Sequence, residues 1–124
     1  MKKIIYSPGE PSGIGPDLII KLSSSNLWED LKIPVVSIGD PKLFLDRAAL
    51  LKKKIRIIEL ESLNQVSKNS KGLIQIIKVT KCSNTRPGKL YKSNAQYVLD
   101  NLTYSIEQTM QNEGTALVTG PLSK

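Results

Sequence analysis

The sequence predicts an α/β fold, a layered sheet with helices on its faces. Short β-branched runs alternate along the chain with longer segments in which apolar residues recur every three or four positions. The composition, with 40% hydrophobic and 23% charged residues, is typical of a folded globular chain. The 124 residues are enough for one hydrophobic core, so a single domain is expected.

The chain opens with a short apolar strand over residues 4–6, and a loop rich in glycine and proline follows it. Residues 16–22 then predict a helix, because Leu18, Ile19 and Leu22 fall on one helical face. The first strand and the first helix are therefore joined by the most unusual segment of the sequence.

The next strand is expected over residues 33–40, a β-branched stretch that ends in a Gly-Asp turn. Asp40 can cap the following helix, in which Pro41 suits the first position. The helix over residues 41–54 has apolar side chains at helical spacing. These are Leu43, Phe44, Ala48 and Leu51.

Residues 54–60 and 72–79 are two further strand candidates, and the polar stretch between them predicts a surface loop. A long helix follows, for which Ser93 or Asn94 can serve as the cap. Its apolar residues recur on one face: Ala95, Val98, Leu99, Leu102, Ile106 and Met110. Residues 115–120 then form a continuously apolar strand, which suits the buried centre of a parallel sheet.

Charge and residue usage exclude several function classes. Scattered lysines dominate the formal net charge of +7 and only 5% of residues are aromatic, so we expect no nucleic-acid binding. The lysines at 52–54 predict a solvated helix end. The chain has no histidine, which removes the commonest general base and transition-metal ligand. Cys82 is the single cysteine and excludes an internal disulfide.

No apolar stretch approaches the length of about 20 residues that a membrane-spanning helix needs. Residues 1–11 reach proline and glycine too early for the apolar core of a secretory signal. The sequence therefore predicts a cytoplasmic protein with no membrane partner.

The segment SPGEPSGIGPDLIIKL, residues 7–22, carries Gly9, Gly13 and Gly15. Their spacing, G-x-x-x-G-x-G, matches neither the dinucleotide fingerprint nor the phosphate-binding P-loop. With Pro16 as the first helical residue, Gly15 would cap the helix. The neighbouring amides would then favour an anion or the polar edge of a ligand.

Acidic residues complicate a simple phosphate site in this segment. Glu10 and Asp17 both add negative charge, which suits a ribose hydroxyl or a cationic ring better. The alternative is that the glycines and prolines only shape a tight turn. A second loop, TGPLSK at residues 119–124, follows the last strand. Both loops would face one cleft if their strands are parallel neighbours.

The stretches SPGEPSGIGPDL and TGPLSK together resemble the amino-terminal part of the 4-hydroxythreonine-4-phosphate dehydrogenases of pyridoxal phosphate biosynthesis. The resemblance covers the whole chain and includes GDPKLFLDRAALL and RPGKLYKSNAQYVLDNLTYSIEQTM. The opening motif is also similar to a Gly-Ile-Gly-Pro loop of the isocitrate and isopropylmalate dehydrogenases. Residues 1–124 would then be the amino-terminal α/β portion of a fold of that kind.

The resemblance implies oxidation of the secondary alcohol of 4-phosphohydroxy-threonine by NAD or NADP, followed by loss of carbon dioxide. In this family three histidines hold a divalent metal (zinc, magnesium or cobalt), which polarises the hydroxyl group. A lysine and an arginine hold the phosphate of the small phosphorylated substrate. Family members are homodimers whose active sites draw residues from both subunits.

The resemblance also assigns candidate site residues within this chain. The cofactor-binding candidates are Gly13, Ile14, Gly15 and Pro16, and the substrate-cleft candidates are Thr119, Gly120 and Lys124. Lys124 could pair with a substrate carboxylate or phosphate, or could be an exposed terminal lysine. The family's Gly-His-Thr segment, metal-binding histidines and phosphate-binding residues lie beyond the counterpart of Lys124. No catalytic residue and no metal ligand is therefore expected in this chain.

Two hypotheses follow from these patterns. In the first, the chain is a fragment of the dehydrogenase and is inactive alone. In the second, it is a stand-alone nucleotide-binding or interaction domain without catalysis, which would bind NAD by itself and need a partner for its exposed sheet edge.

Overall fold

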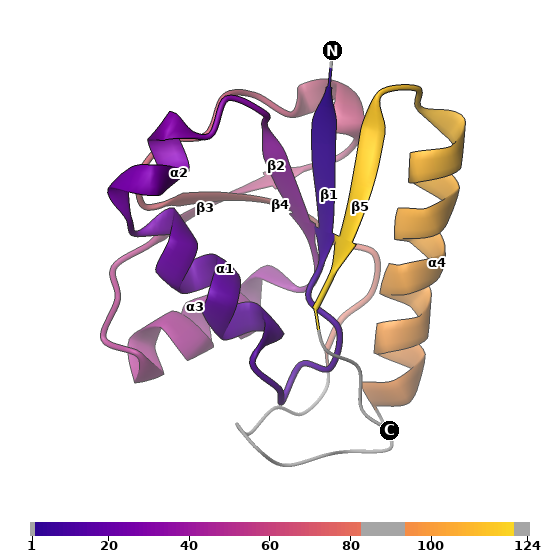
Figure 1. Ribbon diagram of the computed structural model, residues 1–124. Coiled ribbons are helices and arrows are strands. Elements are labelled where there is room, and N and C mark those ends of the chain that lie inside the picture. Colours follow the sequence, from indigo (N-terminus) through magenta and orange to yellow (C-terminus); the bar gives the residue numbers. More distant parts are fainter. Residues whose placement is uncertain (1, 83–93, 121–124) are drawn as a thin grey trace.

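The computed structural model describes residues 2–82 and 94–120 (Figure 1). The strands are β1 (Lys3–Ser7), β2 (Val35–Ile38), β3 (Arg56–Leu60), β4 (Leu73–Ile77) and β5 (Thr115–Thr119). The helices are α1 (Gly15–Ser23), α2 (Asn26–Asp30), α3 (Pro41–Leu50), the short 3₁₀ helix η1 (Leu63–Gln65) and α4 (Ala95–Gln111). The predicted α/β class is confirmed.

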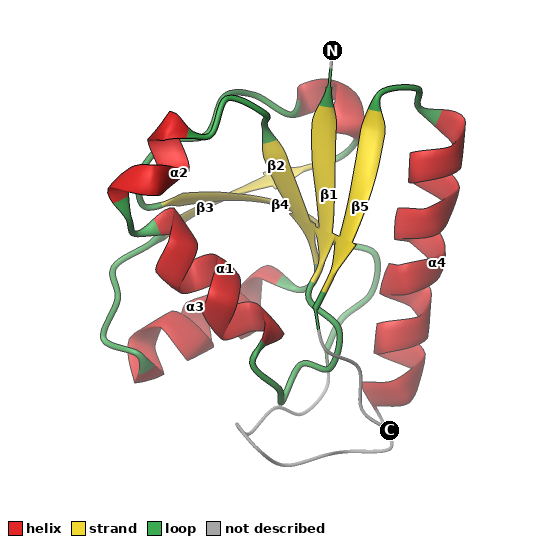
Figure 2. Ribbon diagram, in the orientation of Figure 1, coloured by secondary structure: helices red, strands yellow, loops and turns green. Residues whose placement is uncertain are grey.

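Within these residues the strands form one parallel sheet in the order β3-β4-β2-β1-β5. Its interior strands are buried because both faces are covered, and every residue of β2 is buried. Figure 2 shows the layers, with α1, α2 and α3 on one side of the sheet and α4 on the other. Such two-sided burial is typical of parallel sheets.

The core has two parts, one on each face of the sheet. Trp28, Phe44 and Ile20 fill the face below the first three helices. Ile5 and Val36 point to the opposite face, where they meet buried side chains of the segment after β3 and partly buried Tyr104 and Leu117. Alternate residues of a strand therefore contribute to the core on opposite faces of the sheet.

The predicted start of α3 is confirmed. Asp40 is the N-cap, its carboxylate accepts the amide proton of Lys42 at 3.1 Å, and Pro41 begins the helix. The helix ends at Leu50, earlier than expected, and Lys52 follows with a φ of 56°. The lysines at 52–54 therefore lie beyond a helix end, as predicted.

The position of β5 corrects a sequence prediction. We expected residues 115–120 at the buried centre of the sheet, but β5 pairs only with β1 among the described strands. It stands at an edge, and three of its five residues are exposed. Apolar composition alone does not distinguish an edge strand from a central one.

The buried face of α4 also differs from the predicted one. Tyr97, Asn101 and Ser105 face inward, whereas three members of the apolar stripe are exposed, Leu99 by 55%, Ile106 by 42% and Met110 by 82%. The helix contacts β1 and β5. Asn101 and Ser105 are small enough to let it lie close to these strands.

Two smaller features were not expected. Helix α2 was not predicted, since its five residues are too few for a periodic pattern. The polar stretch over 61–71 is not entirely a surface loop, because Leu63, Val66 and Asn69 are buried. Asn69 accepts the amide proton of Val35 and donates to the carbonyls of Leu31 and Ile33.

Candidate functional site

The first loop proposed from the sequence and the described start of the second, Thr119 and Gly120, lie at one edge of the sheet. Strands β1 and β5 are parallel neighbours with Ser7 opposite Thr119. The amide of Gly120 donates to the carbonyl of Ser7 at 2.7 Å, so the exits of the two strands are joined directly. Figure 1 shows both carboxyl ends, and the start of α1, together at the lower edge of the sheet.

Two glycines enclose one peptide of this edge. A Cβ atom on Gly15 would lie 1.8 Å from the carbonyl oxygen of Pro8, and a Cβ on Gly120 would lie 2.1 Å from the same oxygen. Any larger residue at either position would therefore force the backbone apart. Because Gly15 and Gly120 have no side chains, the start of α1 and the end of β5 can both pack directly against the Pro8 carbonyl.

The remaining glycines of the loop have different roles. Gly9 has a φ of 84°, a left-handed conformation that strains other residues. Gly13 is less demanding, because its Cβ would lie 3.3 Å from the carbonyl of Glu10. The turn-shaping alternative thus accounts for Gly9 and Gly15.

The start of α1 lies one residue earlier than predicted. Ile14 is the N-cap, Gly15 is the first helical residue and Pro16 the second. Ile14 has no capping side chain, and its amide and those of the first turn cannot bond within the helix. This helix start therefore keeps the partial positive charge that favours an anion or a polar ligand edge.

The acidic residues are engaged within the chain, which weakens the objection to an anionic ligand. The Asp17 carboxylate pairs with the Arg47 guanidinium at 2.7 Å. One oxygen of Glu10 accepts the amide proton of Ser12 at 3.3 Å. The charge of Asp17 is thus balanced by an arginine that the sequence analysis did not connect to the loop.

The side chains of Arg47 and Tyr6 hold the loop through hydrogen bonds to its backbone carbonyls. Arg47 is 3% exposed and also donates to the carbonyls of Pro11 and Gly13. The Tyr6 hydroxyl donates to the carbonyl of Gly15 at 2.8 Å, and burial raises the pKa of this phenol. Both side chains hold the main chain of the loop rather than its side chains.

The structure separates the predicted site residues by exposure. Ile14 is 57% exposed, Thr119 is exposed and Gly13 is half-buried, so these can meet a ligand. The other described candidates, Gly15, Pro16 and Gly120, are buried and shape the backbone. Lys124 lies outside the described residues.

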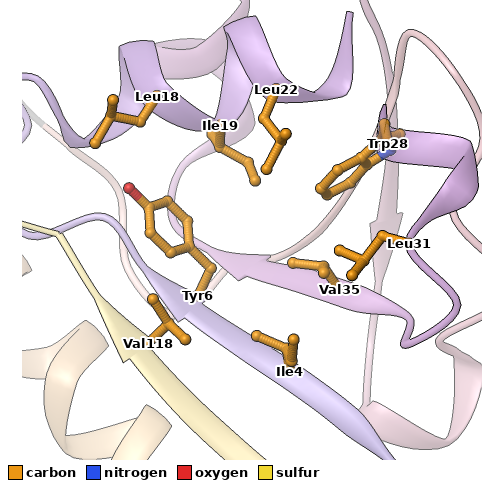
Figure 3. Close-up of a pocket in the computed structure, with 9 residues that line it drawn as sticks. All are labelled: Ile4, Tyr6, Leu18, Ile19, Leu22, Trp28, Leu31, Val35 and Val118. Carbon is orange, nitrogen blue, oxygen red and sulfur yellow. The ribbon is translucent and has the colours of Figure 1, made fainter. Parts of the chain in front are cut away.

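An apolar cavity of about 220 Å³ lies between α1, α2 and the sheet. Figure 3 shows its lining side chains converging from both layers, and they include Leu18, Ile19 and Leu22, as the predicted common helical face requires. Val118 of β5 lines one side. The cavity has almost no polar lining, so it offers a ligand no oriented hydrogen bond.

A second cluster of polar residues lies where β2 ends. The amide of Asp40 donates to the hydroxyl oxygen of buried Tyr97, and the Asp40 carboxylate accepts the amide proton of Cys82 at 2.9 Å. Burial raises the pKa of Tyr97 well above its ordinary value. Asn94 is the N-cap of α4 without a capping bond, and its Oδ1 lies 3.5 Å from Cys82 Sγ.

The described residues contain no group of three or more His, Cys, Asp or Glu side chains that could hold a metal ion. None of the helices in residues 2–82 and 94–120 combines the length and apolar character of a membrane crossing. Among the described residues, the edge where β1 and β5 end offers the amides at the start of α1 as hydrogen-bond donors.

Sequence reasoning missed Arg47 and Tyr6 as parts of the site. A signal for Arg47 was present, since it lies four residues after Leu43 and three after Phe44, on the apolar face of α3. A charged residue on such a face must have a buried partner. Tyr6 gave no signal, because an aromatic residue in a strand is usual.

Comparison with known proteins decides the family. The model of the family described as "Pyridoxal phosphate biosynthetic protein PdxA" matches residues 30–124. The chain belongs to this family. A 4-hydroxythreonine-4-phosphate dehydrogenase from Citrobacter koseri is 32% identical over 124 residues, 100% of this chain and 36% of the relative. One from Yersinia pseudotuberculosis is 34% identical over 122 residues, 98% of this chain and 36% of the relative.

Solved structures of PdxA relatives have the same fold. A 4-hydroxythreonine-4-phosphate dehydrogenase from Burkholderia phymatum superposes with a TM-score of 0.86 at 18% identity, over 100% of this chain and 37% of that one. The Klebsiella pneumoniae enzyme gives 0.85 at 24% identity, over 99% and 37%. The expected isocitrate/isopropylmalate dehydrogenase-like fold is confirmed. The chain spans little more than a third of the length of these relatives.

Proposed function

We propose that this chain is the amino-terminal α/β portion of a dehydrogenase that depends on NAD or NADP and on a divalent metal. The enzyme oxidises 4-phosphohydroxy-threonine, with subsequent decarboxylation, in pyridoxal phosphate biosynthesis. The observation that carries the proposal is the match to dehydrogenases named for this activity along the whole chain. The paired glycine loops supply the physical support.

The role of the chain is to hold the nicotinamide nucleotide beside the substrate. The cofactor, when bound, accepts a hydride from the substrate carbon. Gly13 and Ile14 lie at the surface of the loop, and the first-turn amides of α1 can donate to a phosphate or ribose oxygen. Gly15 and Pro16 set the backbone below them.

The substrate would approach from the second loop. Thr119 is exposed where β5 ends, and Lys124 follows within a few residues. A lysine there would pair with the carboxylate or phosphate of the small phosphorylated substrate. Gly120 would keep this loop against the Pro8 peptide.

The metal does not fit the residues of this chain. The sequence has no histidine, and the described residues form no carboxylate or thiolate cluster. The ligands of the metal would belong to the part of the family's chain that has no counterpart among these 124 residues.

The assembly proposed is a cytoplasmic homodimer. Two features support further contacts on one side of the chain: β5 is a sheet edge, and α4 exposes Leu99, Ile106 and Met110. Exposed apolar surface of this kind is typical of an interface.

The decisive experiment begins with the coding DNA beyond the codon for Lys124. The protein it encodes is assayed with 4-phosphohydroxy-threonine, NAD or NADP and a divalent metal, and reduced nicotinamide is followed by absorbance. Turnover that disappears when the protein ends at Lys124 is the expected result. A protein that continues with the family's histidines and still gives no turnover would overturn the proposal.

A stop codon directly after Lys124 would favour the alternative, a stand-alone nucleotide-binding or interaction domain. Such a domain would bind NADH by itself and form a defined oligomer. Titration of the 124-residue chain with NADH, together with sedimentation analysis, separates it from an inactive fragment.

A further inference from the structure

We propose that Arg47 is a positioning residue that sets the conformation of the nucleotide-binding loop, residues 8–15. The inference deepens the proposed function and rests on it for the identity of the ligand. Arg47 belongs to α3, and its buried guanidinium reaches three acceptors on the segment before and within α1. Nη2 lies 2.6 Å from the Pro11 carbonyl, and Nη1 lies 2.9 Å from the Gly13 carbonyl and 2.7 Å from the Asp17 carboxylate.

The choice of acceptors distinguishes this arrangement from an ordinary buried ion pair. An ion pair needs only the Asp17 carboxylate, whereas Arg47 also binds two main-chain oxygens of the loop. The planar guanidinium fixes the directions of these bonds, which a single ammonium cannot do. Arg47 therefore orients peptide groups as well as balancing a charge.

The planar geometry of the peptide bond links the direction of the Gly13 carbonyl to the direction of the next amide, which can bind a ligand. In a trans peptide the carbonyl and the following amide point in opposite directions, and none of the described peptides is cis. Because the Gly13 carbonyl points at Arg47, the amide of exposed Ile14 points away from it. Arg47 thus directs the Ile14 amide outward, beside the start of α1.

Within the described residues, the other hydrogen bonds of the loop are local or lie at its ends. The N-cap Ile14 has no capping side chain. Gly9 and Gly13 carry the backbone freedom of glycine, which costs entropy when it is fixed. The Gly13 amide donates to the Glu10 carbonyl within the loop itself. Tyr6 anchors the loop only at Gly15. Arg47 therefore provides the contacts from α3 that restrain its middle.

Asn69 is a matched control elsewhere in the fold. It is as buried as Arg47 and also makes three hydrogen bonds, all to the main chain near the amino end of β2. Its replacement removes a comparable buried polar anchor without touching the loop. A purely structural effect on binding should therefore appear in both variants.

The test is titration with NADH of the full protein, which under the proposed function continues beyond Lys124, and of its Arg47→Met, Arg47→Lys and Asn69→Ala variants, alongside their melting temperatures. We expect about tenfold to a hundredfold weaker NADH binding for Arg47→Met, since charge-assisted hydrogen bonds are lost. Compared with Arg47→Met, Arg47→Lys should recover more of the melting temperature than of the affinity for NADH. Asn69→Ala should lower the melting temperature and leave affinity within about twofold. Equal affinity losses at matched melting temperatures in the Arg47 and Asn69 variants would overturn the inference.

A ligand-free readout separates this inference from the proposed function. Amide NMR signals of residues 12–15 should shift, and their hydrogen exchange should accelerate, in Arg47→Lys and, if it folds, in Arg47→Met. Unchanged loop signals in a folded Arg47 variant would refute the positioning role. If the unmodified full protein does not bind NADH while the loop signals still depend on Arg47, the proposed ligand is wrong and the positioning role stands.

Discussion

Helices α3 and α4 lie on opposite faces of one sheet, and they use their apolar residues in opposite ways. In α3 the buried face holds Leu43, Phe44 and Ala48, the residues at helical spacing in the sequence. In α4 the buried face holds Tyr97, Asn101 and Ser105, and most of the predicted apolar stripe is exposed on the outward side. Periodicity therefore identifies both helices but predicts the buried side of only one.

The difference comes from what each helix packs against. The side chains of α3 fill the core beneath the first three helices. Helix α4 lies on β1 and β5, and small polar residues face these strands. Ser105 satisfies its hydroxyl within the helix, by donating to the Asn101 carbonyl at 2.7 Å, so it can be buried at little cost. The outward stripe of α4 is then available to another surface.

The largest effect on stability is expected for Phe44→Ala, which removes a buried ring of α3. Phe44 is fully buried, and its ring occupies the space beside Gly39, where a Cβ would lie 2.7 Å from Cε2. We expect a loss of about 3–5 kcal/mol in the free energy of unfolding, measured with urea. A loss under about 1 kcal/mol would mean that α3 does not anchor this core.

Ser105→Leu tests the inward face of α4. The added side chain has no room at a fully buried position, so unfolding free energy should fall by about 1–3 kcal/mol. Thr103→Leu, at an exposed position of the same helix, is the control and should change it by under about 0.5 kcal/mol. Equal effects in the two variants would contradict the assigned face.

Tyr97→Phe tests the contact that joins the two helices. It removes the acceptor of the Asp40 amide next to α3 and should cost about 1 kcal/mol. Burial raises the folded-state pKa of Tyr97 above the ordinary value of 10.0. Its contribution to stability is therefore complete below that pH and declines as the pH rises toward the folded-state pKa.

Urea unfolding between pH 8 and 11 measures this decline, and it should be shallower in Tyr97→Phe than in the parent chain. Tyr6 and Tyr104 also have raised pKa values through burial, so part of the decline should remain in the variant. Identical pH profiles would show that Tyr97 is not buried as described.

The smallest effect is expected for Ile106→Ser on the outward stripe of α4. Its side chain is already exposed, so unfolding free energy should change by under about 0.5 kcal/mol at low protein concentration. Sedimentation at high concentration should reveal less self-association than in the parent chain. A loss as large as that of Ser105→Leu would mean that another part of the protein covers this stripe.

Local patterns predicted most of the fold. The β-branched runs identified the strands, and the Asp-Pro pair located the start of α3, because both signals act within a few residues. The edge position of β5 and the inward face of α4 could not be predicted in this way. Both depend on which surface packs against each element, and the residues of that element do not encode it.

The candidate site was predictable to the same degree. The glycine spacing indicated the loop, and parallel pairing of β1 and β5 placed it beside Gly120. Arg47 was missed because its acceptors lie more than one element away in the sequence. Long-range hydrogen bonds to main-chain carbonyls leave no pattern around the acceptor, since any residue can provide a carbonyl.

The Pro8 peptide between Gly15 and Gly120 has a consequence for folding. Strand β1 can pair with β2 early, but its other neighbour, β5, comes almost the whole length of the chain later. Closing so long a loop is slow and entropically costly. During synthesis the other four strands can assemble before β5 leaves the ribosome. We therefore expect the edge where β1 and β5 end to be the last part of this chain to acquire its native shape.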